Sequence, residues 1–268
     1  MTIGVVVTTI MNTFYASLVA GIENGLSGEG YSILLNSSYG ESEKEFSAIK
    51  LLIEHRVDGM ILGAVQTHRE AADLLTLNSV PFVLLGRNSP NPKADFVAAD
   101  DIMVGELAVR HLVEKGYDKI LFINARQSYS AQLRAEGFLS AVKAHQSRIK
   151  KHWIKVVPGK EDVERTLREA ARQGLDFNAI FCFNDDIAIE VIRYLKSCKL
   201  RIPDDVGVIG VDNLDFSAIL SPPLTTIDIH KHEIGIRAAE VLRRRMEDRD
   251  CPIQQVILSP KLVERGST

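Results

Sequence analysis

Two pairs of polar residues in the second half of the sequence each follow a short apolar segment. Asn184 and Asp185 follow one such segment, and Asp212 and Asn213 follow the next. Carboxylate oxygens accept hydrogen bonds and an amide both accepts and donates them, so this set suits a ligand with several hydroxyl groups. The simpler interpretation is that Asn184 and Asp185 cap a helix and that Asp212 forms a turn.

The segments around these residues predict a strand–helix–strand unit. Residues 179–183 and 206–211 are apolar runs of the kind that forms strands buried on both faces of a parallel sheet. Between them, Ile187, Val191 and Leu195 recur at helical spacing. Because ligands bind at the carboxyl ends of strands in open α/β sheets, both polar pairs are expected at a ligand-binding edge.

The same alternation of strand and helix runs through the rest of the chain. In the first half, strands are expected at residues 3–8, 31–36, 58–63 and 80–86, and helices at 13–26, 42–56 and 68–78. After a short strand at 96–98, helices are expected at 102–115, 130–145 and 163–174, and strands at 119–124 and 153–157. Such a pattern predicts parallel sheets covered on both faces and joined by right-handed crossovers.

A segment with two prolines, RNSPNPK at residues 87–93, interrupts this rhythm. We therefore expect an α/β protein with two doubly wound parallel-sheet subdomains. The tail adds an extended segment, one more helix and a closing extended stretch, and it can return to the first subdomain before crossing back. Three crossovers would then join the subdomains around a ligand cleft. The assignment is residues 1–99 with about 229–252 for the N-terminal subdomain, and 100–228 with about 253–268 for the C-terminal one.

The composition limits the classes of function. The chain has 268 residues, 46% of them hydrophobic, and a net charge of −3, with Lys and Arg spread along the sequence rather than gathered in the basic stripe typical of nucleic-acid binding. Its three cysteines lack metal-ligand spacing, which favours free thiols in a reducing compartment. We expect no signal peptide, and no apolar run approaches the roughly 20 residues that span a membrane.

The sequence offers no recognised catalytic signature. It contains no GxGxxG after the first strand, no GxxxxGK[ST] and no GxSxG motif. The acid pairs at residues 100–101 and 185–186 would suit a metal or phosphoryl-aspartate site, but no Lys partner is placed by the sequence. We therefore predict that the protein is not an enzyme and that it has no catalytic residue, metal site or cofactor.

Short segments along the whole chain carry a family resemblance. They are, in order, IGVVV, NTFYASLVAGIE, HRVDGMIL, DDIMVGELAVRHLVEKGYDKILFI, RAEGFLSAV, FNDDIAIEVI, LRIPDDVGVIGVDN, PPLTTID and LVERGST. In this order and spacing they resemble the effector-binding core of lactose-repressor-type (LacI/GalR) transcription regulators and the related periplasmic sugar-binding proteins. The resemblance implies a periplasmic-binding-protein-like fold of type I.

The resemblance also implies a function. It indicates the effector-sensing domain of a bacterial transcription repressor. Such a domain binds a small polar metabolite, most simply a sugar, in the cleft between its subdomains and transmits the closure of this cleft to a DNA-binding domain. Such repressors carry a helix-turn-helix before this core, and the motif is absent from this chain, so operator DNA is expected as a partner only through a missing N-terminal domain. A cytoplasmic homodimer without a membrane partner is implied as well. The alternative is a periplasmic sugar-binding protein of a transport system, which the sequence upstream of Met1 would distinguish.

The matching motifs imply which residues contact the ligand. Arg134 matches the ligand-binding arginine of the RxxGF motif and offers a rigid fork of donors. Asp212 and Asn184 supply acceptors and an amide donor, whereas Asp185 is left open between ligand binding and helix capping. We expect Arg134 and Asp212 to be exposed groups at strand ends that contribute little to folding.

Aromatic and polar residues complete the candidate set. Phe14 and Tyr15 are expected to supply an aromatic wall for a sugar or a base, although one of the pair would pack in the core. The other candidates are Asn12, Gln66, Arg87 and Ser130. Departures from the family pattern around Thr13, Arg87 and Asp228 leave the identity of the ligand open.

Overall fold

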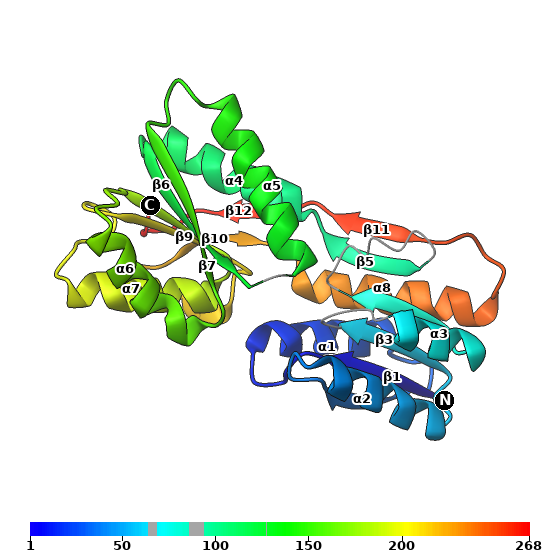
Figure 1. The fold of residues 1–268 in the computed structure, drawn as a ribbon. Coiled ribbons are helices and arrows are strands. Elements are labelled where there is room, and N and C mark those ends of the chain that lie inside the picture. Colours follow the sequence, from blue (N-terminus) through cyan, green and yellow to red (C-terminus); the bar gives the residue numbers. More distant parts are fainter. Residues whose placement is uncertain (64–68, 86–93, 127) are drawn as a thin grey trace. The chain divides into compact units, whose positions relative to one another are not determined.

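The computed structural model describes residues 1–63, 69–85, 94–126 and 128–268. The chain forms two compact units, each assembled from two separate stretches of sequence (Figure 1). Unit 1 comprises Met1–Ala99 and His230–Leu258, and unit 2 comprises Asp100–Ile229 and Ser259–Thr268. Within these described residues each unit holds one six-stranded sheet flanked by helices, which confirms the predicted α/β class.

Unit 1 is an all-parallel sheet with helices that return the chain between strands. Its strands are β1 (Thr2–Val7), β2 (Ser32–Ser37), β3 (Gly59–Gly63), β4 (Phe82–Leu85), β5 (Asp95–Ala99) and β11 (Gln255–Leu258). Its helices are α1 (Thr13–Gly25), α2 (Ser42–Glu54), α3 (Arg69–Leu77) and α8 (Lys231–Glu247). The strand order is β11-β5-β4-β3-β1-β2, and the central strands β3 and β5 are buried along their whole length. The apolar runs seen in the sequence are therefore two-sided core strands.

Unit 2 repeats this architecture with one antiparallel edge. Its strands are β6 (Lys119–Ala125), β7 (Lys151–Val157), β8 (Ala179–Cys182), β9 (Gly207–Val211), β10 (Thr225–Asp228) and β12 (Lys261–Val263). Its helices are α4 (Asp101–Glu114), α5 (Tyr129–Ala144), α6 (Val163–Arg172) and α7 (Asp185–Ser197), with the 3-10 turns η1 (Lys160–Asp162) and η2 (Asp215–Ala218). The strand order is β12-β10-β9-β8-β6-β7, and only the β10–β12 pair is antiparallel.

The placement of β11 corrects the sequence-based domain boundary. We expected all of residues 253–268 in the C-terminal subdomain, but β11 pairs in parallel with β5 of unit 1, from Gln255 beside Phe96 to Leu258 beside Ala99. After its return at His230 the chain stays in unit 1 to the end of β11, because α8 and β11 add one more helix and strand to the unit 1 sheet. Of residues 253–268, only 259–268 belong to unit 2.

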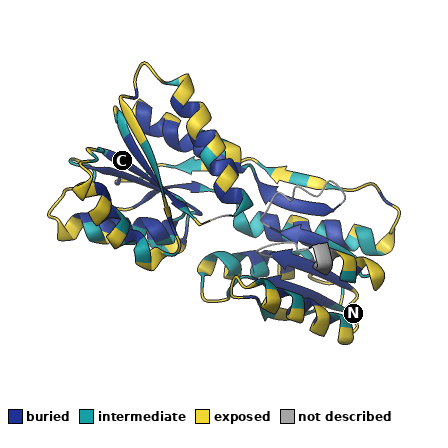
Figure 2. Ribbon diagram, in the orientation of Figure 1, coloured by how far each residue is buried: buried dark blue, intermediate teal, exposed yellow. Residues whose placement is uncertain are grey.

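The core of each unit lies between its sheet and its helices. Figure 2 shows buried strands inside and exposed residues on the outward helix surfaces. In unit 2 the rings of Phe122 and Phe181 stack with centroids 4.2 Å apart, and Phe138 of α5 packs 5.3 Å from Phe122. All three side chains are fully buried, and aromatic burial of this size dominates core energetics. No helix in the described parts of the chain is both long and apolar enough to cross a membrane.

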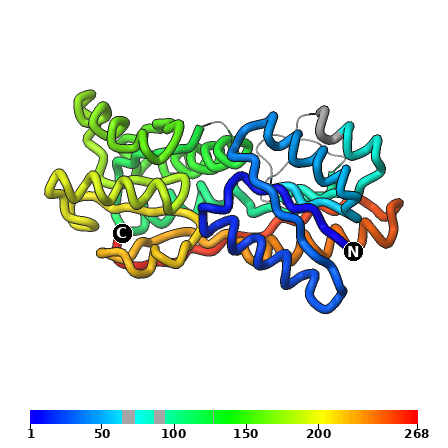
Figure 3. Tube along the Cα trace, turned by 90° about the horizontal axis from the view of Figure 1, so that it is seen from below, coloured from blue at the N-terminus to red at the C-terminus, as the bar shows by residue number. Residues whose placement is uncertain are grey.

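Glycines let one pair of helices in each unit come into backbone contact. In unit 1, α8 runs beside α1 (Figures 1 and 3), and a Cβ atom on Gly21 would lie 2.0 Å from the carbonyl oxygen of His232. In unit 2, a Cβ atom on Gly105 of α4 would lie 2.3 Å from the Arg134 carbonyl oxygen, and one on Gly137 of α5 would lie 1.9 Å from that of Ile102. Side chains at the start of α4 are therefore held against α5.

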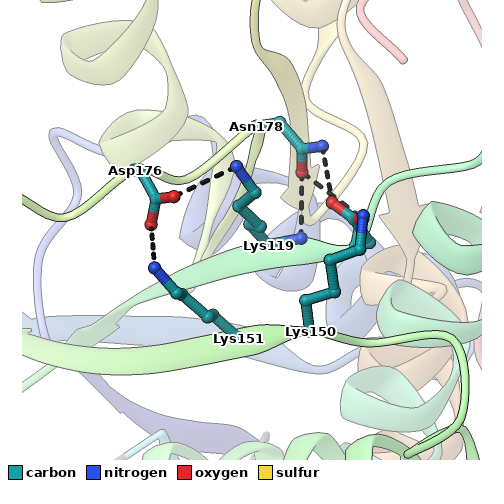
Figure 4. Close-up of polar contacts among 6 residues, drawn as sticks. Lys119, Lys150, Lys151, Asp176 and Asn178 are labelled. Carbon is teal, nitrogen blue, oxygen red and sulfur yellow. Dashed lines mark hydrogen bonds and ion pairs between the residues drawn. The ribbon is translucent and has the colours of Figure 1, made fainter.

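A polar cluster ties together the amino-terminal ends of three strands in unit 2 (Figure 4). Lys119 and Lys151, which begin β6 and β7, both bind Asp176, at 3.1 and 3.0 Å. Asn178, just before β8, accepts from the Lys119 amide at 3.0 Å and donates to Asp118 at 3.1 Å. Hydrogen bonds from Lys151 and Lys119 lower the pKa of Asp176 to about 2. These contacts lie at the edge opposite the strand ends that carry the candidate site residues.

Candidate functional site

The carboxyl edge of the unit 2 sheet gathers five of the ten candidate residues. Strands β9, β8 and β6 are neighbours and run in parallel, so the segments that follow them emerge at one edge. Arg134 and Ser130 lie on the helix after β6, Asn184 and Asp185 follow β8, and Asp212 follows β9. The expectation that these residues share an edge is confirmed, because it follows from parallel pairing alone.

Arg134 is buried, which corrects the expectation that it is exposed. Its side chain is 5% exposed, and its Nε donates to Oδ1 of Asp101 at 2.8 Å. Its Nη1 donates to the carbonyl oxygen of Phe183, and the guanidinium carbon lies 4.3 Å from the centroid of the Phe183 ring. In the described parts of the chain, no protein acceptor is recorded for the Nη2 amino group. Three of the five N–H donors, one on Nη1 and both on Nη2, therefore remain for a ligand or for water.

Two of the residues that hold Arg134 were missed by the sequence reasoning. Asp101 is itself 2% exposed and lies at the start of α4, where Asp100 caps the helix by accepting from the Met103 amide at 3.0 Å. The two adjacent acids after the predicted strand at 96–98 could have drawn attention to this position. A helix cap accounts for Asp100 but leaves the role of Asp101 unexplained. Phe183 was read as part of a buried strand, yet β8 ends at Cys182 and the Phe183 side chain is half-buried.

Asn184 and Asp185 have different structural roles. Asn184 is the N-cap of α7, with Oδ1 accepting from the Ile187 amide at 3.0 Å, so the capping interpretation holds for this residue. This bond uses the side-chain oxygen, and the amide nitrogen belongs to a half-buried residue at the sheet edge. Asn184 therefore still suits a ligand-binding role.

Asp185 is a structural carboxylate. It is 0% exposed, and its Oδ2 accepts from the Leu214 amide at 2.9 Å and from the Ser217 hydroxyl at 2.6 Å. Its Oδ1 accepts from the Thr226 hydroxyl at 2.7 Å, and a Cβ atom on Gly210 would lie 2.2 Å from this oxygen. Asp185 thus joins the start of α7 to the segments after β9 and in β10. Because it is fully enclosed, we remove it from the candidate ligand set.

The thiol closest to this edge is not poised for nucleophilic chemistry. Cys182 ends β8 and is completely buried. Burial, and to a smaller extent the nearby carboxylate of Asp185, raises the pKa of the Cys182 thiol well above its usual value. A thiol needs its thiolate form to act as a nucleophile, so this cysteine is a core residue.

Asp212 is also buried, again in contrast to the expectation of exposure. It is 5% exposed and has a φ of +105°, a backbone region that non-glycine residues rarely adopt. Its amide donates to the Ile227 carbonyl at 2.9 Å, which fixes the turn after β9. The following Asn213 accepts from Arg265 at 2.6 Å and donates to Asp228 at 3.0 Å. The strained turn is held by neighbouring segments.

Ser130 and its neighbours form the start of α5. Ser128 caps the helix by accepting from the Ala131 amide at 3.1 Å, and Ser130 is 7% exposed. Asn124, which sequence reasoning missed, donates from Nδ2 to the Ala131 carbonyl at 2.9 Å and accepts from the Ala125 amide at 2.9 Å. The buried side chain of Asn124 therefore fixes the path of the chain from β6 into α5, the helix that carries Arg134.

The candidates of unit 1 lie after β1, at the carboxyl edge of their own sheet. Asn12 caps α1, with Oδ1 accepting from the Phe14 amide at 2.7 Å. The rings of Phe14 and Tyr15 meet edge to face with centroids 5.0 Å apart, and the Tyr15 hydroxyl donates to Thr8 Oγ1 at 2.9 Å. Both rings are half-buried, so the expected aromatic pair is present at this edge. Gln66 and Arg87 lie outside the described residues.

The polar side chains at these edges suit recognition of a ligand by hydrogen bonds. Among the described residues, no group of three or more His, Cys, Asp or Glu side chains is arranged to hold a metal ion. Arg134, Asn184 and Asp212 instead combine a fixed guanidinium, an amide and a carboxylate near an aromatic ring. Such sets recognise ligands with several hydroxyl groups, because each hydroxyl both donates and accepts.

Comparison with known proteins identifies the family of this chain. Residues 109–268 match a family model described as "Periplasmic binding protein-like domain". The chain is 31% identical to the "HTH-type transcriptional repressor PurR" of Aliivibrio fischeri (strain MJ11), over 99% of this chain and 80% of that protein. It is also 31% identical to the "Ribose operon repressor" of Escherichia coli (strain K12), over 99% of this chain and 82% of that protein.

A solved structure shows the same similarity at the level of fold. A LacI family transcriptional regulator from Enterococcus faecalis V583, crystallised with bound ribose, superposes with a TM-score of 0.90 at 29% identity. The comparison covers 100% of this chain and 98% of that one. The likeness therefore extends over both units.

Proposed function

This chain belongs to the LacI family of transcriptional regulators and is a ligand-sensing domain, and we propose that its effector is a sugar or a sugar derivative. The relatives are named as transcriptional repressors, so the transport alternative is not supported. One is named for the ribose operon, and another was crystallised with ribose. A sugar effector is the simplest reading of these names together with the polar set of unit 2.

Arg134 carries the proposal. It is a nearly buried guanidinium at the carboxyl edge of the sheet, and its Nη2 donors lack a described protein acceptor. Burying such donors is costly unless something accepts from them, so they suit an acceptor that a ligand supplies. Asp212 and Asn184 offer the complementary acceptors and a donor. We retain Phe14, Tyr15, Asn12 and Ser130 as further contacts to be tested one by one.

A ligand screen tests this proposal. The 268-residue chain is heated with single sugars, sugar phosphates and nucleobases, and hits are measured by isothermal titration. At a ligand concentration ~100 times the dissociation constant, binding adds about 2.7 kcal/mol to the free energy of unfolding. Stabilisation by a sugar or sugar phosphate is the expected result. Stabilisation by a nucleobase alone, or by no compound, would contradict it.

We further propose that this domain regulates transcription through a DNA-binding segment that is not part of the 268 residues. The chain corresponds to 80% of the length of one repressor relative and 82% of another. The 268-residue sequence is acidic overall, with a net charge of −3. We expect the isolated chain to give no sequence-dependent gel shift at physiological salt, because phosphate contacts supply most of the affinity for DNA. A specific shift with the isolated chain would overturn this part.

A homodimer acting in the cytoplasm completes the proposal. Repressors that read two-fold-symmetric operators use two-fold-symmetric proteins, and operator DNA lies in the bacterial cytoplasm. Sedimentation of the chain at tens of micromolar should give twice the mass of the 29.7 kDa monomer. A single monomeric species would show that this chain does not dimerise by itself.

A further inference from the structure

The guanidinium of Arg134 is held on three sides by other parts of unit 2. Asp101 accepts from Nε at 2.8 Å, the Phe183 carbonyl accepts from Nη1, and the Phe183 ring covers one face of the group. Gly105 and Gly137 allow the close approach of α4 and α5 that brings Asp101 to this position. Among the described residues no acceptor faces the Nη2 end of the fork, and the contacts to Nε and Nη1 set its orientation before any ligand arrives.

Asp101 also cancels the charge of Arg134. The two side chains are 3% and 5% exposed, so water screens their interaction poorly and the pair acts as one neutral unit. A ligand that meets Nη2 therefore meets oriented N–H donors without a net positive charge. Such donors suit a hydroxyl or ring oxygen, whereas a phosphate or carboxylate gains most from an uncompensated cation.

We propose that Asp101 is a positioning residue that makes Arg134 selective for uncharged hydroxyl groups over anionic ones. This inference rests on the proposed function, in which Arg134 contacts the effector, and it narrows the effector to a neutral sugar. Arg265, whose backbone lies beside the start of β10, donates from its guanidinium to the Leu224 carbonyl and to Asn213 Oδ1. Arg126 follows β6 and is exposed, so a test must separate its effect from that of Arg134.

The test compares paired ligands on matched variants of the full chain. Wild type and Asp101→Asn are titrated with ribose and ribose 5-phosphate, and with glucose and glucose 6-phosphate. The unit 1 variant Asp95→Asn is the control, because Asp95 is buried like Asp101 and pairs with Arg245, which is 15% exposed, at 2.8 and 3.1 Å. Asp95 begins β5, at the opposite end of that strand from the candidate edge. Arg126→Ala reports any contribution of the exposed arginine.

The expected result is a change in the ratio of the two affinities. Wild type should bind the neutral sugar at least about tenfold more tightly than its phosphate, and Asp101→Asn should reduce this ratio by about tenfold or more. Asp95→Asn should leave the ratio unchanged. A wild type that prefers the phosphate, or an Asp101→Asn ratio equal to that of wild type, would overturn the inference while leaving a sugar-sensing function in place.

Two further measurements keep the test decisive. If no sugar or sugar phosphate binds wild type, the proposed function fails, and titration with inorganic phosphate then tests the charge argument alone. If Asp101→Asn binds inorganic phosphate and wild type does not, the charge argument is supported. If Asp101→Asn gains no phosphate binding, the charge argument is overturned. If Asp101→Asn does not fold, Asp101→Glu takes its place, because this variant keeps the negative charge but moves the carboxylate by one methylene group. Its affinity for the neutral sugar should fall, while the ratio of neutral-sugar to sugar-phosphate affinity should stay as in wild type. Unchanged affinity in Asp101→Glu would overturn the positioning role.

Discussion

The carboxylate of Asp185 lies 2.7 Å from the hydroxyl of Thr226, and both residues are completely buried. Asp185 stands at the start of α7 and Thr226 in β10, so this contact spans 41 residues of sequence. The same carboxylate accepts from Leu214 and Ser217. A side chain that would look like a ligand contact in the sequence is therefore a fixed link inside unit 2.

Replacing Asp185 by Ala should destabilise the protein. The change leaves three buried donors without their acceptor, and each such group costs about 1–3 kcal/mol. We expect the free energy of unfolding to fall by about 3 kcal/mol or more in urea titrations. Asp204→Ala, whose side chain is 63% exposed, is the control and should stay within about 0.5 kcal/mol of wild type. Equal stability of the two variants would show that the buried links are dispensable.

Arg134→Ala should weaken both effector binding and folding. Loss of a charged hydrogen-bond donor should reduce affinity at least about tenfold in isothermal titration. Because the change also leaves Asp101 buried without its cation, the free energy of unfolding should fall by about 3–5 kcal/mol. This loss of stability is larger than the change of less than about 1 kcal/mol that an exposed arginine would give.

A core variant separates the two effects of Arg134. Ile209 lies in β9, is fully buried and points into the core, so Ile209→Ala should cost about 2–5 kcal/mol of stability. At temperatures where it remains folded, its effector affinity should match that of wild type. If Arg134→Ala loses stability but keeps full affinity, then the arginine is structural and the proposed site is wrong.

Gly235→Ala should destabilise unit 1 although alanine is the better helix former. Alanine in a helix interior is favoured by about 1 kcal/mol over glycine. Here, however, the new Cβ would lie 2.2 Å from the Leu18 carbonyl oxygen of α1, and backbone cannot move away cheaply. We expect a net loss of about 1–3 kcal/mol, measured by chemical denaturation. Gly266→Ala, where the nearest atom is 3.4 Å away, should have little effect, and a stabilised Gly235→Ala would refute the close packing of α1 and α8.

Asp176 should make the free energy of unfolding fall as the pH is lowered. Its folded pKa is lowered from 3.8 to about 2, chiefly by hydrogen bonds from Lys151 and Lys119. A carboxyl with a lowered folded pKa contributes stability above its unfolded pKa and loses that contribution as the pH falls through the folded value. The loss should therefore appear between about pH 4 and pH 2. Titration of the Asp176 carboxyl by NMR should show the lowered pKa, and Asp176→Asn should have a shallower fall in stability over this range; an ordinary pKa would contradict the cluster in Figure 4.

The sequence alone predicted the elements and the edge at which polar residues gather. Buried strands such as β8 and β9 are short apolar runs, and amphipathic helices such as α7 show helical spacing, because both patterns are local. Asn184 also kept the helix-cap role that the sequence indicates, since an N-cap bonds to an amide only three residues away. The family resemblance added the ligand-sensing role and singled out Arg134.

The tertiary structure decided which of these polar residues are buried and what holds them. Asp101 and Arg134 are 33 residues apart, Asp95 and Arg245 are 150 apart, and nothing local marks either pair as an ion pair. The sheet that β11 joins was likewise undetermined, because a short strand with alternating exposure fits any free parallel edge. The periodicity of a sequence shows which face of a helix or strand is apolar. Which side chains become partners across the fold depends instead on how closely helices such as α4 and α5 approach. Glycines that face the backbone of the neighbouring helix set that distance.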